Sequence, residues 1–518
     1  MKKAKRYLFH SGQQSYNLTD KFLTTFTYVW AEPFNLHKND LEPIFDKSEF
    51  NEDYSDAFFL LDETSSWLTN YELLKQLPAN QIIYSSQAKL SGKVQQLLDL
   101  RGAFKLDFGA DLSNLQFTLN HYFYGRGEGY RITLSEFVLQ KQFMANAKLV
   151  GNNYYDLKVA ATNGWTKLAE LRHSVYLPLE MDEDIIIEFQ QLGSVELKVE
   201  ALCFSLNQNK IIGRFSKSGK ELHDGKLVIA GLKEATYFIL QFYVRGEGKL
   251  HLGYIHIRRS LGKYGNIVLG AKTVNDDRHL SGDIAYLFNA GDLKPPLNVI
   301  FSGYHTAESF EGYRMMKNLQ APFLLISDLR YEGGGFYIGS DHFEQKVLAV
   351  IKSYLKKLNF TNQDLVLSGM SMGTYGAMYY GSQLNPGAIV IAKILLNIGT
   401  IAGNISIERP EDFRCASDLV LINEGANDKE AQKRMNDHMW RKLSNSCFTN
   451  TTFALGYMEN DDYDPNAFAE LREFLVKRNP QVHLLSKGFP GRHNDDTPSI
   501  ANWFVRQVGK TLKNKYQR

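Results

Sequence analysis

The stretch "LVLSGMSMGTYGAMYYG", Leu365–Gly381, decides how the C-terminal half of this 518-residue chain folds. It holds a Gly-x-Ser-x-Gly motif with Ser371 at its centre. The residues before the motif form an apolar strand pattern, and the residues after it form a helical pattern. A serine on a sharp strand-to-helix turn needs small neighbours, which Gly369 and Gly373 provide. The motif therefore predicts a nucleophile elbow, with Ser371 as the nucleophile.

A nucleophilic serine needs a base, and three histidines follow Ser371 in the chain. His438 lies in a helical pattern and His483 alternates within a strand, so we expect packing or surface roles for both. His493 lies in "SKGFPGRHNDDTPS", a loop between the last predicted strand and the last predicted helix. An α/β sheet with a nucleophile elbow carries its base in the loop after its last strand, so His493 is the predicted base.

The acid that orients the base is expected after the preceding strand, "TTFALGYM", where the chain continues "ENDDYDP". A carboxylate at this point would hold the imidazole in the required tautomer and stabilise its protonated form. Asp461 and Glu459 are ranked slightly above Asp462, and Asp464 is a fourth candidate. Residue chemistry alone does not choose among these four.

An oxyanion hole needs two backbone N–H groups. We expect one from Met372, directly after the nucleophile, and the other from Tyr304, because Gly303 lets the chain turn inward there. His305 could line the site or serve the loop. The glycines of "YEGGGFYIG" lack the lysine and the spacing of a phosphate loop, so we predict a flexible loop and no cofactor.

Residues 266–518 alternate strand and helix patterns, which predicts a doubly wound, mostly parallel sheet of the α/β-hydrolase type. "DHFEQKVLAVIKSYLKKL" is a predicted helix, and "DLVLINEG" is a predicted strand. Residues 1–110 show the same alternation on a smaller scale, which predicts a small α/β domain.

Residues 111–265 change to a period of two, which predicts a central antiparallel β-sandwich. Within it Phe-Tyr-x-Arg-Gly-Glu-Gly occurs twice, beginning at Phe123 and at Phe242. We expect both copies to be hairpins whose glycines serve the turn. The alternative is an aromatic face on which Arg126 or Arg245 binds sugar, and the sandwich would then present a surface to a glycosylated substrate or a partner protein.

The composition excludes several classes of protein. A formal net charge of +2 gives no general case for nucleic-acid binding. Three widely spaced cysteines, Cys203, Cys415 and Cys447, indicate reduced thiols in the cytosol and neither a disulfide framework nor a metal site. The basic N-terminus lacks the apolar region of a signal peptide, and no apolar run is long enough to span a membrane. At most a peripheral membrane contact is expected.

The order of the three domains, together with "SGMSMGTYGAM", "YMENDDYDP" and "GFPGRHNDD", resembles the accessory secretory protein two family. These proteins belong to the accessory Sec export system of streptococci and staphylococci. The resemblance implies export of serine-rich repeat glycoproteins from the cytosol, with accessory secretory proteins one and three and the accessory Sec ATPase as partners. It also implies O-acetylation of N-acetylglucosamine on the exported adhesin, with Ser371 matching the nucleophile and His493 the base.

Two other interpretations remain open from the sequence. The chain could be a non-catalytic scaffold of the export complex, because a hydrolase fold does not by itself establish catalysis. It could also be a plain carboxylesterase.

Overall fold

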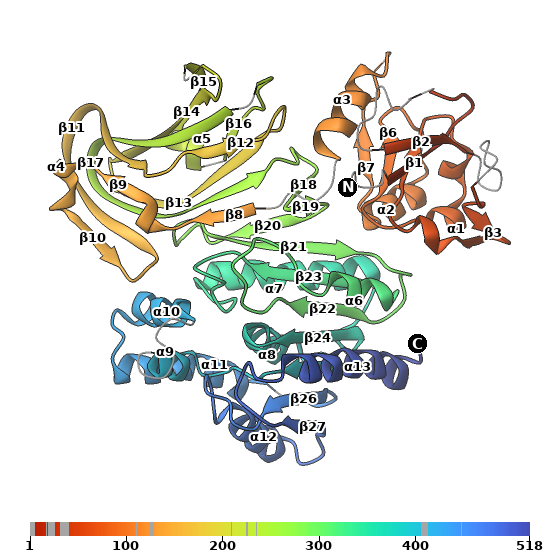
Figure 1. The fold of residues 1–518 in the computed structure, drawn as a ribbon. Helices are drawn as coiled ribbons and strands as arrows, with labels where there is room; N and C mark the ends of the chain where they lie inside the picture. Colours follow the sequence, from red (N-terminus) through yellow and green to blue (C-terminus); the bar gives the residue numbers. More distant parts are fainter. Residues whose placement is uncertain are drawn as a thin grey trace.

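The computed structural model describes residues 6–16, 18, 26–31, 41–109, 111–123, 129–208, 210–223, 226–234, 236–405, 413–446 and 448–518. Its strands form three large sheets that lie one after another along the chain (Figure 1). The first is parallel, the second antiparallel and the third mostly parallel. The prediction of a multidomain chain that mixes α/β and antiparallel β structure is confirmed.

The N-terminal sheet has five parallel strands in the order β2-β1-β5-β6-β7: β1 (Arg6–Ser11), β2 (Phe26–Trp30), β5 (Phe58–Leu61), β6 (Ile82–Ser85) and β7 (Phe104–Leu106). Helices α1 (Tyr71–Leu74) and α2 (Gly92–Leu100) pack on one face. Helix α3 (Ser113–Tyr122) covers the other face through Leu115 and Leu119. The predicted boundary at residue 110 therefore falls too early, because α3 shares the core of this sheet.

Among the described residues, the middle sheet has ten antiparallel strands that enclose an apolar core. Its two longest described strands are β11 (Tyr154–Leu171) and β17 (Thr236–Arg259). Strand β17 pairs with five of the other described strands along its length. The strands are β8 (Gly129–Ile132), β9 (Phe137–Leu139), β10 (Ala147–Val150), β11 (Tyr154–Leu171), β12 (Val175–Leu177), β13 (Glu183–Gly193), β14 (Glu196–Ser205), β15 (Ile211–Ser218), β16 (Leu227–Ile229) and β17 (Thr236–Arg259). The antiparallel pairing agrees with the predicted β-sandwich. The two layers of a sandwich are not separate sheets here, because strands that pair with both layers join them into one sheet.

The second copy of the Phe-Tyr-x-Arg-Gly-Glu-Gly repeat lies in the middle of β17. It is not a hairpin. Gly246 and Gly248 have positive φ values of 84° and 148°. A Cβ atom on Gly246 would lie 2.3 Å from the carbonyl oxygen of Ser194, and one on Gly248 would lie 2.1 Å from that of Leu192. The glycines therefore let the β13–β14 turn approach β17. Residues 124–128 of the first copy, Arg126 included, lie outside the described residues.

Arg245 is engaged by its own sheet. Its guanidinium donates to Glu196 at 2.8 and 3.1 Å, and its central carbon lies 4.6 Å from the centre of the Trp165 ring. These contacts hold the arginine against β14 and β11. Binding of sugar by Arg245 stays a prediction.

The C-terminal sheet has eight strands in the order β20-β21-β23-β22-β24-β25-β26-β27. From β23 to β27 neighbouring strands are parallel, and β20 and β21 form an antiparallel edge. The strands are β20 (Lys272–Asn275), β21 (Asp283–Asn289), β22 (Leu297–Phe301), β23 (Phe323–Asp328), β24 (Leu365–Met370), β25 (Ala388–Ala392), β26 (Thr452–Met458) and β27 (His483–Phe489).

Helices cover both faces of this sheet (Figure 1). Alternate residues of β24 explain why: Leu365 and Leu367 enter one apolar core and Val366 enters the other. One face carries α7 (Asp341–Leu358), α8 (Met372–Leu384), α9 (Ile398–Ile405), α10 (Arg414–Glu424), α11 (Lys429–Ser444) and α12 (Ala467–Arg478). The other carries α6 (Tyr313–Asn318) and α13 (Thr497–Tyr516).

One predicted strand is a helix. The segment "DLVLINEG" lies mostly in α10, where Cys415, Leu419 and Val420 are buried at helical spacing. A short apolar run fits either structure, and burial against α9 and α11 decides for the helix here. None of the described helices combines the length and the apolar content that a bilayer crossing needs.

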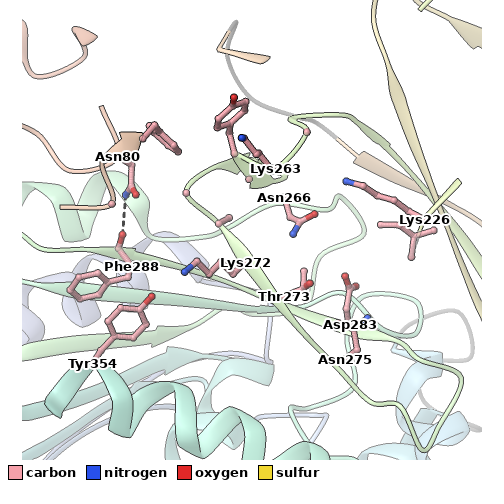
Figure 2. Close-up of a pocket in the computed structure, with 18 of the residues that line it drawn as sticks. Asn80, Lys226, Lys263, Asn266, Lys272, Thr273, Asn275, Asp283, Phe288 and Tyr354 are labelled. Carbon is pink, nitrogen blue, oxygen red and sulfur yellow. Dashed lines mark hydrogen bonds between the residues drawn. The ribbon is translucent and has the colours of Figure 1, made fainter. Parts of the chain in front are cut away.

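Where the three sheets meet, the described residues line a cavity of about 890 Å³ (Figure 2). Asn80 of the N-terminal unit donates to the carbonyl of Phe288 at 2.9 Å beside it. The lining includes Lys226, Lys263 and Lys272, but none of the predicted site residues. The cavity is therefore separate from the Gly-x-Ser-x-Gly region.

A buried ionic cluster joins β17 to the C-terminal unit. Arg258 donates to both carboxylate oxygens of Asp283, at 2.9 and 3.0 Å, and to Glu308. His256 lies between Glu308 and Glu188, whose Oε1 is 3.2 Å from Nε2. Burial alone would lower the pKa of His256, but the two glutamates raise it to about 9.

This raised pKa predicts a pH-dependent stability. The native state keeps the His256 proton up to about pH 9, whereas the unfolded chain loses it near pH 6.5. The contribution, up to about 3 kcal/mol, is fully present below pH 6.5 and is lost as pH rises through 9. In thermal unfolding from pH 6 to 10, His256→Gln should melt at a lower temperature than the parent protein below pH 8. The difference between the two melting temperatures should shrink progressively above pH 9. The exposed pair of His173 with Glu136 supplies the control variant His173→Gln, which should show little effect. A constant deficit for His256→Gln across the whole range would contradict the assignment.

Candidate functional site

Ser371 lies on the tight turn between β24 and α8. Its backbone has φ 53° and ψ −124°, a conformation that non-glycine residues rarely adopt. A Cβ atom on Gly369 would lie 2.3 Å from the Gly373 carbonyl oxygen, and one on Gly373 would lie 2.1 Å from that of Phe301. The two glycines are therefore required for the close packing of strand, turn and helix. The strand, the tight turn and the helix follow one another as expected around the motif, and the role of Ser371 as nucleophile stays a prediction.

His493 faces Ser371 from the loop between β27 and α13. Its Nε2 lies 2.9 Å from Ser371 Oγ, and its Nδ1 lies 2.7 Å from Asp461 Oδ2. With the ring proton on Nδ1, the imidazole donates to Asp461 and accepts from the serine hydroxyl. The side chain of His493 is 1% exposed, so little water competes for these two hydrogen bonds.

The loop after β26 sends its acidic side chains in different directions. Asp461 Oδ1 accepts from the backbone N–H groups of Tyr463 and Asp464, which fixes the carboxylate while Oδ2 meets the imidazole. Asp462 accepts from the backbone N–H of His493 at 3.1 Å. Both residues therefore hold His493, one by its ring and the other by its main chain.

The remaining two acidic candidates face elsewhere. Glu459 is exposed, and its backbone N–H pairs with Phe489 in the sheet. The expectation that ranked Glu459 with Asp461 is therefore corrected: Asp461 alone of the two meets the imidazole. Asp464 is buried and accepts from the N–H groups of Leu396 and Asn397, both at 2.8 Å. Burial raises the pKa of Asp464 to about 7, although these hydrogen bonds oppose the shift.

The two expected oxyanion donors lie at the same edge of the sheet. Met372 begins α8, so its N–H belongs to the positive end of that helix. Tyr304 follows β22, the neighbour of β24, and a Cβ atom on Gly303 would lie 3.2 Å from the Met370 carbonyl oxygen. The loop after β22 thus packs closely on the end of β24, and the oxyanion role of Met372 and Tyr304 stays a prediction.

The other predicted histidines lie away from this group. His305 places its ring nitrogens 3.0 Å from the carbonyl oxygens of Gly303 and Ser309, so it braces its own loop. His438 lies on α11 and its Nε2 is 3.0 Å from Glu424. His483 is the exposed first residue of β27. No group of histidine, cysteine and acidic side chains suited to a metal occurs among the described residues.

The sequence did not reveal the aromatic side of the site. The rings of Tyr463 and His493 have centres 4.5 Å apart, and Phe413 stacks on Tyr463 at 5.5 Å. Tyr304 continues this row, with its ring centre 4.8 Å from that of Phe413. The row joins the acid loop to the loop after β22. No pattern in the sequence links these residues, which come from three separate segments.

The sequence predicts a flexible loop at the triple glycine, but two of its members pack beside the expected oxyanion donors. A Cβ atom on Gly333 would overlap the ring of Tyr304, and one on Gly334 would overlap the side chain of Met372. Their φ values of 95° and 122° favour glycine in any case. The run of three glycines was the available signal, and it indicates close packing here.

Comparisons with known proteins agree with this architecture. Residues 13–518 match the model of a family described as the accessory Sec system GspB-transporter. An accessory Sec system protein of Staphylococcus aureus is 43% identical over 347 residues, which are 66% of this chain and 65% of the relative, so this alignment spans just under two thirds of that relative. A second, from Streptococcus gordonii, is 34% identical over 448 residues, 86% of this chain and 81% of the relative.

Among solved structures, a chain of the Glycosylation Associate Protein (Gap123) complex from Streptococcus agalactiae superposes with a TM-score of 0.85. It shares 27% sequence identity, and the alignment covers 99% of each chain. The similarity therefore extends over all three sheets and not only over the Gly-x-Ser-x-Gly region. Together with the family match from residue 13 to the C-terminus, it identifies this chain as a member of the accessory secretory protein two family of the accessory Sec system.

Proposed function

We propose that the chain is a serine acyltransferase. Ser371 Oγ attacks the carbonyl carbon of an acyl donor while His493 Nε2 accepts the hydroxyl proton. The N–H groups of Met372 and Tyr304 stabilise the oxyanion that forms. The intermediate then collapses, the donor's leaving group departs with the proton from His493, and the acyl group remains on Ser371.

A sugar hydroxyl completes the reaction. It attacks the acyl-enzyme, His493 accepts its proton, and the acyl group leaves Ser371 as an ester of the sugar while the serine regains its proton. Asp461 accepts from Nδ1 throughout and stabilises the imidazolium in each half-reaction. The observation that carries the proposal is the pair of distances, 2.9 Å from Ser371 to His493 and 2.7 Å from His493 to Asp461, on a hydrolase-type elbow.

Family membership supports the choice of acceptor and partners. We infer that the acyl group is acetyl and that the acceptor is N-acetylglucosamine on a serine-rich repeat glycoprotein awaiting export in the cytoplasm. The partners would be accessory secretory proteins one and three and the accessory Sec ATPase. The match to a chain of a glycosylation-associated complex supports assembly with such proteins.

A scaffold without catalysis and a plain esterase predict different results. A serine-reactive fluorophosphonate labels an activated Ser371 and leaves an unactivated serine unlabelled. Labelling would therefore exclude the non-catalytic scaffold but not the esterase. Hydrolysis of an acetyl ester, measured with and without a sugar acceptor, then separates transfer from hydrolysis. An esterase would release acetate without forming acetylated sugar.

Ser371→Ala tests the nucleophile. The substitution removes one oxygen from a strained turn, so the variant should fold as well as the parent or slightly better. It should still join the export complex and support secretion, while the exported adhesin carries no acetyl groups on its sugars. Mass spectrometry of the adhesin glycans, beside the amount of adhesin exported, makes the measurement. Persistent acetylation would remove Ser371 from the mechanism. Joint loss of acetylation and export in a folded variant would show that the two functions are inseparable.

Replacing each of two neighbouring acids by its amide tests the assignment of Asp461. Asp461→Asn keeps the shape but cannot hold the imidazole in the required tautomer, so ester turnover should fall by roughly 10³- to 10⁴-fold. Glu459→Gln, two residues away on the exposed side of the loop, is the matched control and should change turnover less than about twofold. Equal effects of the two substitutions would mean that Asp461 is not the acid of the site.

A further inference from the structure

Lys393 is a buried cation beside the site that the proposed reaction does not use. Lys393 directly follows β25 and is 3% exposed. Its backbone has φ 55°, the left-handed conformation that disfavours side chains. A long charged residue in a buried, strained position is expensive to retain unless its surroundings use it.

The backbone at this position links two of the three segments that carry the Ser371–His493–Asp461 group. The carbonyl of Ala392 accepts from the N–H of Ser371 at 3.0 Å. The N–H of Lys393 donates to the carbonyl of Gly456 at 3.1 Å, and Gly456 lies in β26, the strand that leads to Asp461. Lys393 therefore stands where the serine turn and the acid-bearing strand meet.

Its side chain reaches the third segment. Lys393 Nζ donates to Thr497 Oγ1 at 2.6 Å and to Asn494 Oδ1 at 3.3 Å. Asn494 is the residue after His493, and Thr497 begins α13. The ammonium thus holds the end of the loop that carries the imidazole.

The ammonium also acts through its charge. Burial lowers the pKa of Lys393, and Asp461 opposes that shift by favouring the charged form. The other charged groups on these segments are the carboxylates of Asp462, which accepts from the His493 N–H, of Asp464, whose pKa is raised to about 7 by burial, of Asp495 and Asp496, and of the exposed Glu459. Arg492 supplies a cation at the exposed end of the same loop. Lys393 is a buried cation whose charge interacts with the carboxylate of Asp461.

We propose that Lys393 is a positioning residue for the base: it holds the His493 loop and balances the negative charge of Asp461. The proposal rests on the proposed acyl transfer. Without the ammonium, the surrounding carboxylates would hold a proton on the imidazole more firmly. The base would then become available only at higher pH, although the serine, the histidine and the acid are all present.

The rate of fluorophosphonate labelling of the full chain between pH 5 and 9 tests this. In that reaction Ser371 Oγ forms a bond to phosphorus, the phosphorus–fluorine bond breaks, and the proton passes to His493. Lys393→Met and Lys393→Gln keep much of the side-chain length but remove the charge. Each should move the pH of half-maximal rate upward by about one unit, the order expected for loss of one nearby unit charge at an effective dielectric near 20. Lys393→Arg keeps the charge, so its pH of half-maximal rate should stay close to that of the parent.

Thr497→Val separates the two roles, because it removes the 2.6 Å hydrogen bond and leaves the ammonium. It should lower the maximal labelling rate several-fold with a smaller change in the midpoint. It also keeps the test open if the charge-removing variants fail to fold, since unchanged rate and midpoint in Thr497→Val would overturn the positioning role. A folded Lys393→Met or Lys393→Gln with the parental midpoint would overturn the charge role. Failure of the parent chain to label would instead defeat the proposed function, so the two failures are distinguishable.

Discussion

The strained, positive-φ backbone of Ser371 is the constraint on which the C-terminal unit depends. A non-glycine residue in such a conformation costs on the order of 1–3 kcal/mol, and it persists only where the surrounding structure enforces it. Here β24 is buried on both faces, its neighbours β22 and β25 are paired on either side, and α8 starts at the next residue. Gly369 and Gly373 make this packing possible, because a side chain at either position would collide with backbone.

A second constraint follows from burial of the acid loop. Carboxylates removed from water need hydrogen-bond donors, and each one in this loop has a different set. Asp461 accepts hydrogen bonds from two backbone N–H groups and from the imidazole. Asp462 accepts from the backbone N–H of His493, and Asp464 accepts from the backbone N–H groups of residues 396 and 397. The loop is therefore fixed by its own charges, and the position of Asp461 against the imidazole is a product of that whole arrangement.

This explains which parts were predictable from sequence. The elbow is a local property, since strand pattern, glycines and helix pattern are contiguous, and His493 follows from chain order. The choice of Asp461 over Glu459 was not available, because it depends on which way each side chain points after β26. The sequence wrongly predicts a strand around Leu419, because a short apolar run has no decisive period. The sequence wrongly predicts a hairpin at Gly246, because glycine permits turns and close backbone approach alike.

The buried cluster on β17 ties the geometry of the site to the middle sheet. Glu308, which meets Arg258 and His256, lies in the same loop as Tyr304, the expected oxyanion donor. Gly129, the last residue of the first repeat, forms an isolated bridge with Glu308. A buried glutamate with two cationic partners resists displacement, because breaking such a cluster leaves an uncompensated charge. The loop after β22 is therefore held from two sides, by the end of β24 through Gly303 and by β17 through Glu308. Any movement of the middle sheet against the C-terminal sheet would reach the backbone of Tyr304 through this contact.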